Sequence, residues 1–247
     1  MPAHQYAERP CTDTGTSPAR IVTLELAIVT DRVRLRRSAQ EQADEDAFLA
    51  LYGAWTPMEP TTFAAEMVGF EYPWWVVGGW AIEAATGFRR EHDDTDISIL
   101  VCDVAAFVEF MAGRWHVWNN VGGVLHPLGD RWMTVDEPQS QLWLRADARS
   151  PWIVDIPLTP DVDGLWSNKR LPEHIAPVEE VTWRAADGIL YLKPEIVLTY
   201  KATNRRAKDD LDFEATLPIL TEERRDWLEA ALSELVPNHH WLERLRS

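Results

Sequence analysis

The chain of 247 residues is 46% apolar, which is enough for one large domain or two small ones, each with its own core. Its 24 Lys and Arg residues face 40 Asp and Glu, and the net charge of −16 argues against nucleic acid as a partner and favours a small cationic molecule. Cys11 and Cys102 make no disulfide framework, and no apolar stretch has the length of a signal or membrane segment, so we expect a cytoplasmic protein without a membrane partner.

The first part of the chain has weak patterns. Residues 1–20 mix Pro, Thr, Ser and charged residues without a period, and we expect a loose tail there. Ile21–Arg37 is β-branched and then alternates Arg with Val and Leu, which predicts an extended strand. The role of this extension is not indicated by its sequence.

Two helices are expected next. Ser38 and Glu41 form a capping box, which predicts a helix to about Tyr52. The pair Thr61–Thr62 offers a cap for a second helix, which should end near Gly69.

From Trp74 the sequence changes to a strand, turn and helix pattern. The apolar run Trp74–Val77 predicts a strand and the alanine-rich segment Trp80–Ala85 predicts a helix, with Gly78 and Gly79 between them. Free N–H groups at the start of such a helix attract phosphate. Gly78 and Gly79 are therefore predicted to bind the phosphates of a nucleotide, although the pair can also serve only tight packing.

Two carboxylates open the next predicted strand. Asp94 and Asp96 stand at the head of the β-branched run Ile97–Val101, and side chains two apart on a strand share a face. Such a pair repels itself unless a divalent cation lies between the carboxylates. A solvated acidic turn is the alternative, and the apolar strand directly behind argues against it. A metal pair beside a phosphate site predicts nucleotide chemistry.

These residues also carry a family resemblance. The pattern GGWA at Gly78–Ala81, followed by Arg90-x-His92-x-Asp94-x-Asp96, resembles the nucleotidyltransferase superfamily of DNA polymerase β. Within it, the pattern is similar to aminoglycoside 2''-nucleotidyltransferases and lincosamide nucleotidyltransferases. The resemblance implies that Arg90 and His92 either contact the nucleotide or orient the carboxylates.

The chain departs from the family pattern at two positions. Glu83 stands where these relatives usually have Asp, so no role is assigned to it. Trp80 replaces the Ser that usually helps to hold the triphosphate, so backbone N–H groups must do more of the holding.

Short strands follow the central stretch. We expect a helix capped by Asp103 over Val104–Ala112, strands over Trp115–Asn119, Gly123–His126, Gln141–Arg145, Trp152–Pro157, Val181–Trp183 and Ile189–Leu192, and hairpin turns at Gly122–Gly123 and Asp187–Gly188. Asp155 lies inside an apolar strand, where an unpaired carboxylate is costly. It is therefore the predicted third acid of the site, the alternative being a structural partner of Arg145.

At Pro194 the pattern changes from strands to helices. We expect helices over Glu195–Thr203, over Ala207–Leu217 and from Thr221 to about Leu235. Strands first and helices afterwards predict an α+β fold, with a mixed sheet of nucleotidyltransferase type and a C-terminal helical domain. The expected division is an extension over residues 1–54, a catalytic domain over 55–193 and a helical domain over 194–247.

The C-terminal helices carry a second block of the family resemblance. The pattern PE, YKA and R-x-KD-x-x-DF falls on Pro194, Glu195, Lys201, Arg206, Lys208, Asp209, Asp212 and Phe213. The resemblance implies that Lys201 and Lys208, which lie seven residues apart, face the triphosphate. The alternative is a salt bridge of these lysines with Asp209 or Asp212.

The resemblance implies transfer of a nucleoside monophosphate, AMP from ATP, to a hydroxyl of an aminoglycoside or lincosamide type of acceptor. Asp94, Asp96 and Asp155 would hold two Mg²⁺ ions, and Asp155 would accept the proton of the attacking hydroxyl. Three other classes compete: a toxin-type nucleotidyltransferase acting on tRNA or protein, a metal-dependent glycosyltransferase, and a non-catalytic nucleotide-binding relative. The acidic charge argues against tRNA, the glycine-helix unit against a glycosyltransferase, and the presence of all three acids against a non-catalytic role.

Overall fold

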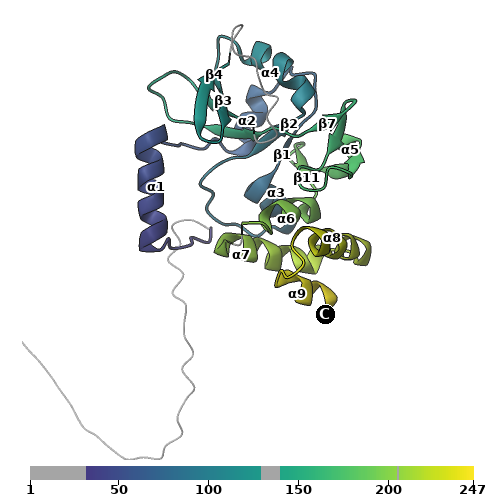
Figure 1. Cartoon of the computed structure of the whole chain (residues 1–247). Coiled ribbons are helices and arrows are strands. Elements are labelled where there is room, and N and C mark those ends of the chain that lie inside the picture. The colour runs from purple at the N-terminus through teal and green to yellow at the C-terminus, as the bar shows by residue number, and fades with distance from the viewer. Residues whose placement is uncertain (1–31, 129–139, 205) are drawn as a thin grey trace, which may run out of the picture. The chain divides into compact units, whose positions relative to one another are not determined.

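The computed structural model describes residues 32–128, 140–204 and 206–247, which form α-helices and three β-sheets (Figure 1). The helices are α1 (Ala39–Tyr52), α2 (Pro60–Glu66), α3 (Gly78–Thr86), α4 (Val104–Met111), α5 (Val178–Val181), α6 (Pro194–Lys201), α7 (Ala207–Thr216), α8 (Glu222–Leu235) and α9 (Trp241–Arg246). The strands are β1 (Trp74–Val76), β2 (Ile97–Ile99), β3 (His116–Val121), β4 (Val124–Pro127), β5 (Gln141–Arg145), β6 (Val154–Pro157), β7 (Asp161–Val162), β8 (Leu165–Ser167), β9 (Ile175–Ala176), β10 (Thr182–Arg184) and β11 (Leu190–Leu192). The predicted α+β class is confirmed.

The central sheet has the strand order β10-β11-β1-β2 and contains both parallel and antiparallel neighbours. Its inner strand β1 pairs with β2 through Val76 opposite Ile97, and with β11 through Val76 opposite Tyr191. Val76 and Ile97 are completely buried because both faces of these short strands are covered. The sheet therefore fixes the end of β1, where the glycine pair begins, beside the start of β2.

A second sheet, in the order β4-β3-β5-β6, is joined to the central one at the acidic positions. Isolated bridges connect Asp96 with Asp155 and Leu100 with Thr159, so β6 continues beside β2. The predicted hairpin at Gly122–Gly123 is present between β3 and β4.

A third sheet, β7-β8-β9, was not predicted. Its strands have only two or three residues, which is too short for an alternating pattern to be recognised. A signal was nevertheless present, because Asp163 and Gly164 link β7 to β8 and both have positive φ, as a two-residue hairpin requires.

The C-terminal helices pack on α3. Both α6 and α7 contact α3, and α8 packs on α6, so the helix that follows the glycine pair is held between the central sheet and the C-terminal segment (Figure 1). The buried residues Ala81 and Ile82 form the inner face of α3. The division of the chain at residues 54 and 193 stays a prediction.

Helix α1 has the predicted capping box, in which the Ser38 side chain accepts from the Glu41 N–H and the Glu41 carboxylate accepts from the Ser38 N–H. It has no buried residue. Its inner side reaches the body of the protein through Phe48 and Tyr52, whose rings make edge contacts with Trp143 at centroid distances of 6.0 and 5.7 Å.

Some predicted boundaries were wrong. The cap of α2 is Glu59 rather than Thr61 or Thr62, because Pro60 occupies the first helical position, where its missing N–H costs nothing. Asp103 precedes α4, but its backbone is already helical and its side chain caps nothing. The predicted tail over residues 1–20 and most of the strand over Ile21–Arg37 lie outside the described residues. Among those described, no helix combines the length and apolarity needed to cross a membrane.

Candidate active site

The glycine pair touches the acidic strand and the Arg-His segment directly. Gly78 has φ +63°, and a Cβ there would collide with Oδ2 of Asp96 and lie only 3.0 Å from its Cγ. A Cβ on Gly79 would collide with Nη2 of Arg90 and lie 2.7 Å from Nδ1 of His92. The glycines are therefore required for close approach of these three side chains to the N-terminus of α3. Their predicted binding of phosphate stays a prediction.

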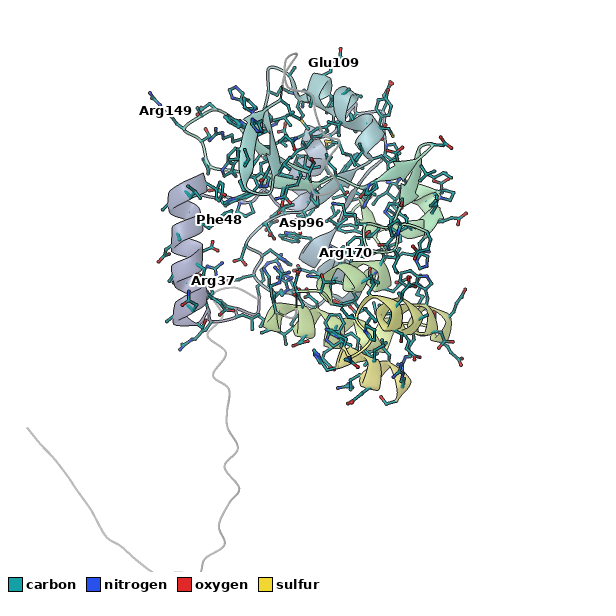
Figure 2. The ribbon with its side chains drawn as sticks, in the orientation of Figure 1. Arg37, Phe48, Asp96, Glu109, Arg149 and Arg170 are labelled. Carbon is teal, nitrogen blue, oxygen red and sulfur yellow. The ribbon has the colours of Figure 1, made fainter. Side chains whose placement is uncertain are left out.

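The second and third predicted acids lie side by side. Asp96 and Asp155 form an isolated parallel bridge, and the Asp155 N–H donates to the Thr95 carbonyl at 3.0 Å. The Val77 N–H donates to the Asp96 carbonyl at 2.9 Å, which ties this bridge to the strand before the glycines. Figure 2 shows Asp96 at the centre of the view.

The carboxylates strongly affect one another. Burial, followed by repulsion from Asp94, raises the pKa of Asp96 to about 7. Burial, followed by repulsion from Asp96 and Asp94, raises the pKa of Asp155 well above its usual range. The Asp155 Oδ1 atom is buried and accepts no hydrogen bond from the described residues. A bound cation would relieve the repulsion that acts on Asp96 and Asp155.

These residues suit Mg²⁺ by their chemistry, because hard carboxylate oxygens are its usual protein ligands. The orphaned Oδ1 of Asp155 is the observation of this structure that fits a cation. Within the described ranges, however, no group of three or more His, Cys, Asp or Glu side chains is drawn close enough to hold an ion. The metal-ligand roles of Asp94, Asp96 and Asp155 therefore stay predictions.

A buried ion-pair network connects the Arg-His segment to α6 and α7. Arg90 donates to both oxygens of Asp212, at 2.8 and 2.9 Å. Nζ of Lys201 lies 2.9 Å from Asp212 and 3.2 Å from Asp209, and Nε of Arg206 lies 2.8 Å from Asp209. Burial alone would raise the pKa values of Asp209 and Asp212, yet the surrounding cations hold both below the usual range. Three cations share two acids, so the network keeps a positive excess.

The predicted lysines have different environments. Lys201 is buried in this network, so the salt-bridge alternative describes its position in the structure. Lys208 is half-buried and pairs with Asp93 at 3.2 Å, a partner that was not predicted; Arg37 also donates to Asp93, at 2.7 Å. A role of either lysine in nucleotide binding stays a prediction.

Glu83, which was given no role, holds His92 in place. One Glu83 oxygen lies 2.8 Å from Nε2 of His92 and also accepts from Arg32. The His92 ring stacks on Trp80 with centroids 4.3 Å apart, and burial lowers the pKa of His92 despite the opposing effect of Glu83. The side-chain partners of Arg90 and His92, Asp212 and Glu83, are not among the three predicted catalytic acids, and both alternatives for Arg90 and His92 stay predictions.

Lys169 was missed by the sequence reasoning. It lies between β8 and β9 and makes no ion pair within 4 Å with the described residues, but it lies within the field of Asp155 and Asp96. Burial lowers its pKa to about 8, while the two carboxylates oppose that shift. The only sequence signal was a basic pair, Lys169 and Arg170, in a polar segment that belongs to no family motif. Lys169 is therefore a cation without a carboxylate partner among the described residues, and its pKa responds to two of the predicted acids.

Two cavities lie away from the acids. One, of about 630 Å³, lies between α4 and β3, and the other, of about 610 Å³, lies among β8, β9 and the starts of α6 and α8. None of Asp94, Asp96 and Asp155 lines either cavity.

Comparisons with known proteins gave solved structures alone. No protein-family model matches the chain, and no curated protein matches it. The antibiotic-resistance factor ANT(2'')-Ia in solution is similar at 19% identity and a TM-score of 0.42, covering 69% of this chain and 87% of its own. The lincosamide antibiotic adenylyltransferase LnuA with bound lincomycin is similar at 17% identity and a TM-score of 0.43, covering 64% of this chain and 96% of its own. ANT(2'')-Ia in complex with adenylyl-2''-tobramycin is similar at 17% identity and a TM-score of 0.43, covering 69% of this chain and 93% of its own.

Proposed function

We propose that the protein transfers a nucleoside monophosphate, AMP from ATP, to a hydroxyl of a small-molecule acceptor of aminoglycoside or lincosamide type. The observation that carries this proposal is the pairing of Asp96 with Asp155 directly beside the Gly78 turn. Nucleotidyl transfer needs acidic side chains for two tasks: some organise the phosphates, and one accepts a proton from the attacking hydroxyl.

Asp94, Asp96 and Asp155 are the residues that would hold Mg²⁺. When bound, the metal would neutralise charge on the triphosphate and on the displaced pyrophosphate. The free N–H groups at the start of α3 would hold phosphate oxygens, since Trp80 in the first turn supplies no hydroxyl. Lys169 would add positive charge near the leaving group.

Asp155 would act on the acceptor. Its carboxylate takes the proton from the attacking hydroxyl, whose oxygen forms a bond to the α-phosphorus as the bond from that phosphorus to the β-phosphate oxygen breaks. The leaving pair of electrons departs with pyrophosphate.

The acceptor is expected to be cationic because the chain has a net charge of −16. Purified protein with Mg²⁺ and ATP is incubated with a panel of aminoglycosides and lincosamides, and the products are weighed by mass spectrometry. We expect one added AMP on at least one member, abolished in Asp155→Asn and retained in Asp226→Asn, an exposed control on α8. Modification of tRNA or protein without any antibiotic adduct would replace this proposal with the toxin-type activity.

A further inference from the structure

The described part of the N-terminal extension pairs with the segment that leads to the first predicted acid. Val33 and Arg90 form an isolated parallel bridge. The Val33 N–H donates to the Arg89 carbonyl and the Glu91 N–H donates to the Val33 carbonyl, both at 2.9 Å. One bridge is too short to hold two segments together, so side chains must add to it. We refer to residues 32–37 below as the N-terminal segment.

Arg32 makes three contacts at one end of the N-terminal segment. Its guanidinium donates to Glu83 and to the Arg90 carbonyl, the latter at 2.9 Å, and lies 4.7 Å from the centroid of the Trp80 ring. The Arg32 and Glu83 side chains are 18 and 13% exposed, so water screens this ion pair less than a surface pair. Burial would raise the pKa of Glu83, yet hydrogen bonds from His92 and Arg32 hold it below the usual range. Glu83 therefore stays charged.

These contacts lead to the main chain of Asp94. Glu83 also holds His92, whose ring stacks on Trp80. Nε1 of Trp80 in turn donates to the Asp94 carbonyl at 3.2 Å. Arg32 touches both Glu83 and Trp80, so it supports this chain of contacts at two points.

The other end of the N-terminal segment holds the residue before Asp94. Arg37, which Figure 2 labels beside the start of α1, donates to Asp93 at 2.7 Å. Lys208 lies 3.2 Å from the other oxygen of Asp93. The Asp93 side chain is 53% exposed, so this pair should contribute less than the pair of Arg32 with Glu83.

We propose that Arg32 is a positioning residue for the proposed nucleotidyl transfer, on which this inference rests: it fixes the main chain at Asp94 and so orients that carboxylate for Mg²⁺. Groups that orient a metal ligand commonly contribute about 10- to 100-fold to metal affinity. Arg89 does not replace Arg32, because its Nε lies 3.8 Å from Glu83, beyond hydrogen-bond distance. The N-terminal extension, whose sequence indicated no role, thereby supports the active site.

The test measures the Mg²⁺ concentration at which full-length protein half-maximally binds a non-hydrolysable ATP analogue in equilibrium dialysis. Arg32→Met removes the guanidinium and keeps an apolar stem, and we expect this Mg²⁺ constant to rise about tenfold. A purely structural Arg32 would lower the folded fraction and leave the constant unchanged, because the folded molecules would have a normal site. Arg32→Lys keeps the charge without the forked geometry, so the constant should rise about threefold.

Arg34→Met is the matched control. Arg34 belongs to the same segment and pairs with Glu91 at 3.1 Å, but its side chain is 79% exposed, so the Mg²⁺ constant should change less than about twofold. Hydrogen exchange read by mass spectrometry adds a measurement that needs no ligand. The amides of residues 89–96 should exchange about tenfold faster in Arg32→Met and at the wild-type rate in Arg34→Met.

A further variant tests the proposal should Arg32→Met not fold. Trp80→Phe removes the N–H that donates to Asp94 and keeps a ring for stacking, so the Mg²⁺ constant should again rise about tenfold. The proposal is overturned if the folded variants bind Mg²⁺ and analogue as wild type does, if Arg34→Met matches Arg32→Met, or if exchange is unchanged. A wild-type protein without Mg²⁺-dependent binding of the analogue would contradict the proposed function itself, which is a different result.

Discussion

The Gly78→Ala substitution tests whether a glycine is required at position 78 for the close approach of the Asp96 side chain. Two effects should add. An alanine at φ +63° costs about 1–2 kcal/mol of backbone free energy. The new Cβ also collides with the Asp96 carboxylate, and rotating that side chain still leaves the Asp96 Cβ only 3.2 Å away, which is tighter than an ordinary contact. Overpacking of this kind costs about 1–3 kcal/mol.

Gly87→Ala is the matched control. Gly87 ends α3 at φ +73°, but no atom of the described chain lies within 4 Å of its Cβ position. We expect urea unfolding to give Gly87→Ala a loss of about 1–2 kcal/mol and Gly78→Ala a loss of about 2–5 kcal/mol. Turnover should be normal in the control but about 100-fold lower in Gly78→Ala, because Asp96 is displaced by a few tenths of an ångström or more. Equal stability and equal turnover in the two variants would refute the reasoning.

Three further predictions concern charge. Lys201→Met should lower the free energy of unfolding in urea by about 3–5 kcal/mol, since it removes a cation from the buried Asp209 and Asp212. Lys208→Met should lower it by less than about 1 kcal/mol. Similar losses in the two variants would contradict the ion-pair network. Lys169 is charged below its pKa of about 8, so the affinity for ATP should weaken as the pH rises through that value. Lys169→Met should remove this pH dependence. An unchanged pH profile in the variant would place Lys169 away from the phosphates. Raising salt should increase the KM of a cationic acceptor, because screening shortens to about 8 Å at physiological ionic strength, and a salt-independent KM would indicate an uncharged acceptor.

Sequence patterns predicted the helices and strands that depend on interactions between residues close in the chain, such as helix caps and apolar runs. The capping box at Ser38 and the Thr221 cap of α8 are both present, and β5 has the predicted bounds, Gln141–Arg145. The strand and helix around Gly78 were also predicted, because the change from an apolar run to an alanine-rich one is visible within a dozen residues.

What sequence could not supply was long-range pairing. Arg90 and Asp212 are 122 residues apart, and no local period indicates that they form a buried bidentate pair. The same is true of Lys169, which follows β8 and whose pKa nevertheless responds to Asp155 in β6, a strand of another sheet. Glu83 was set aside because it differs from the family pattern, yet that acid fixes His92. Motifs therefore selected candidate residues and left their partners in the fold unknown.

The central claim is the division of labour among the three carboxylates. Nucleotide binding is measured by isothermal titration with a non-hydrolysable ATP analogue and Mg²⁺, beside turnover, for Asp94→Asn, Asp96→Asn and Asp155→Asn. Asp94→Asn and Asp96→Asn should lose both binding and turnover, because both side chains would hold the metal mainly for nucleotide binding. Asp155 would also contact the metal, but its main predicted role is to accept the proton of the hydroxyl. Asp155→Asn should therefore bind the analogue almost normally while turnover falls by about 10²–10⁴, the usual contribution of a general base. An Asp155→Asn enzyme with normal turnover would show that another residue accepts the proton.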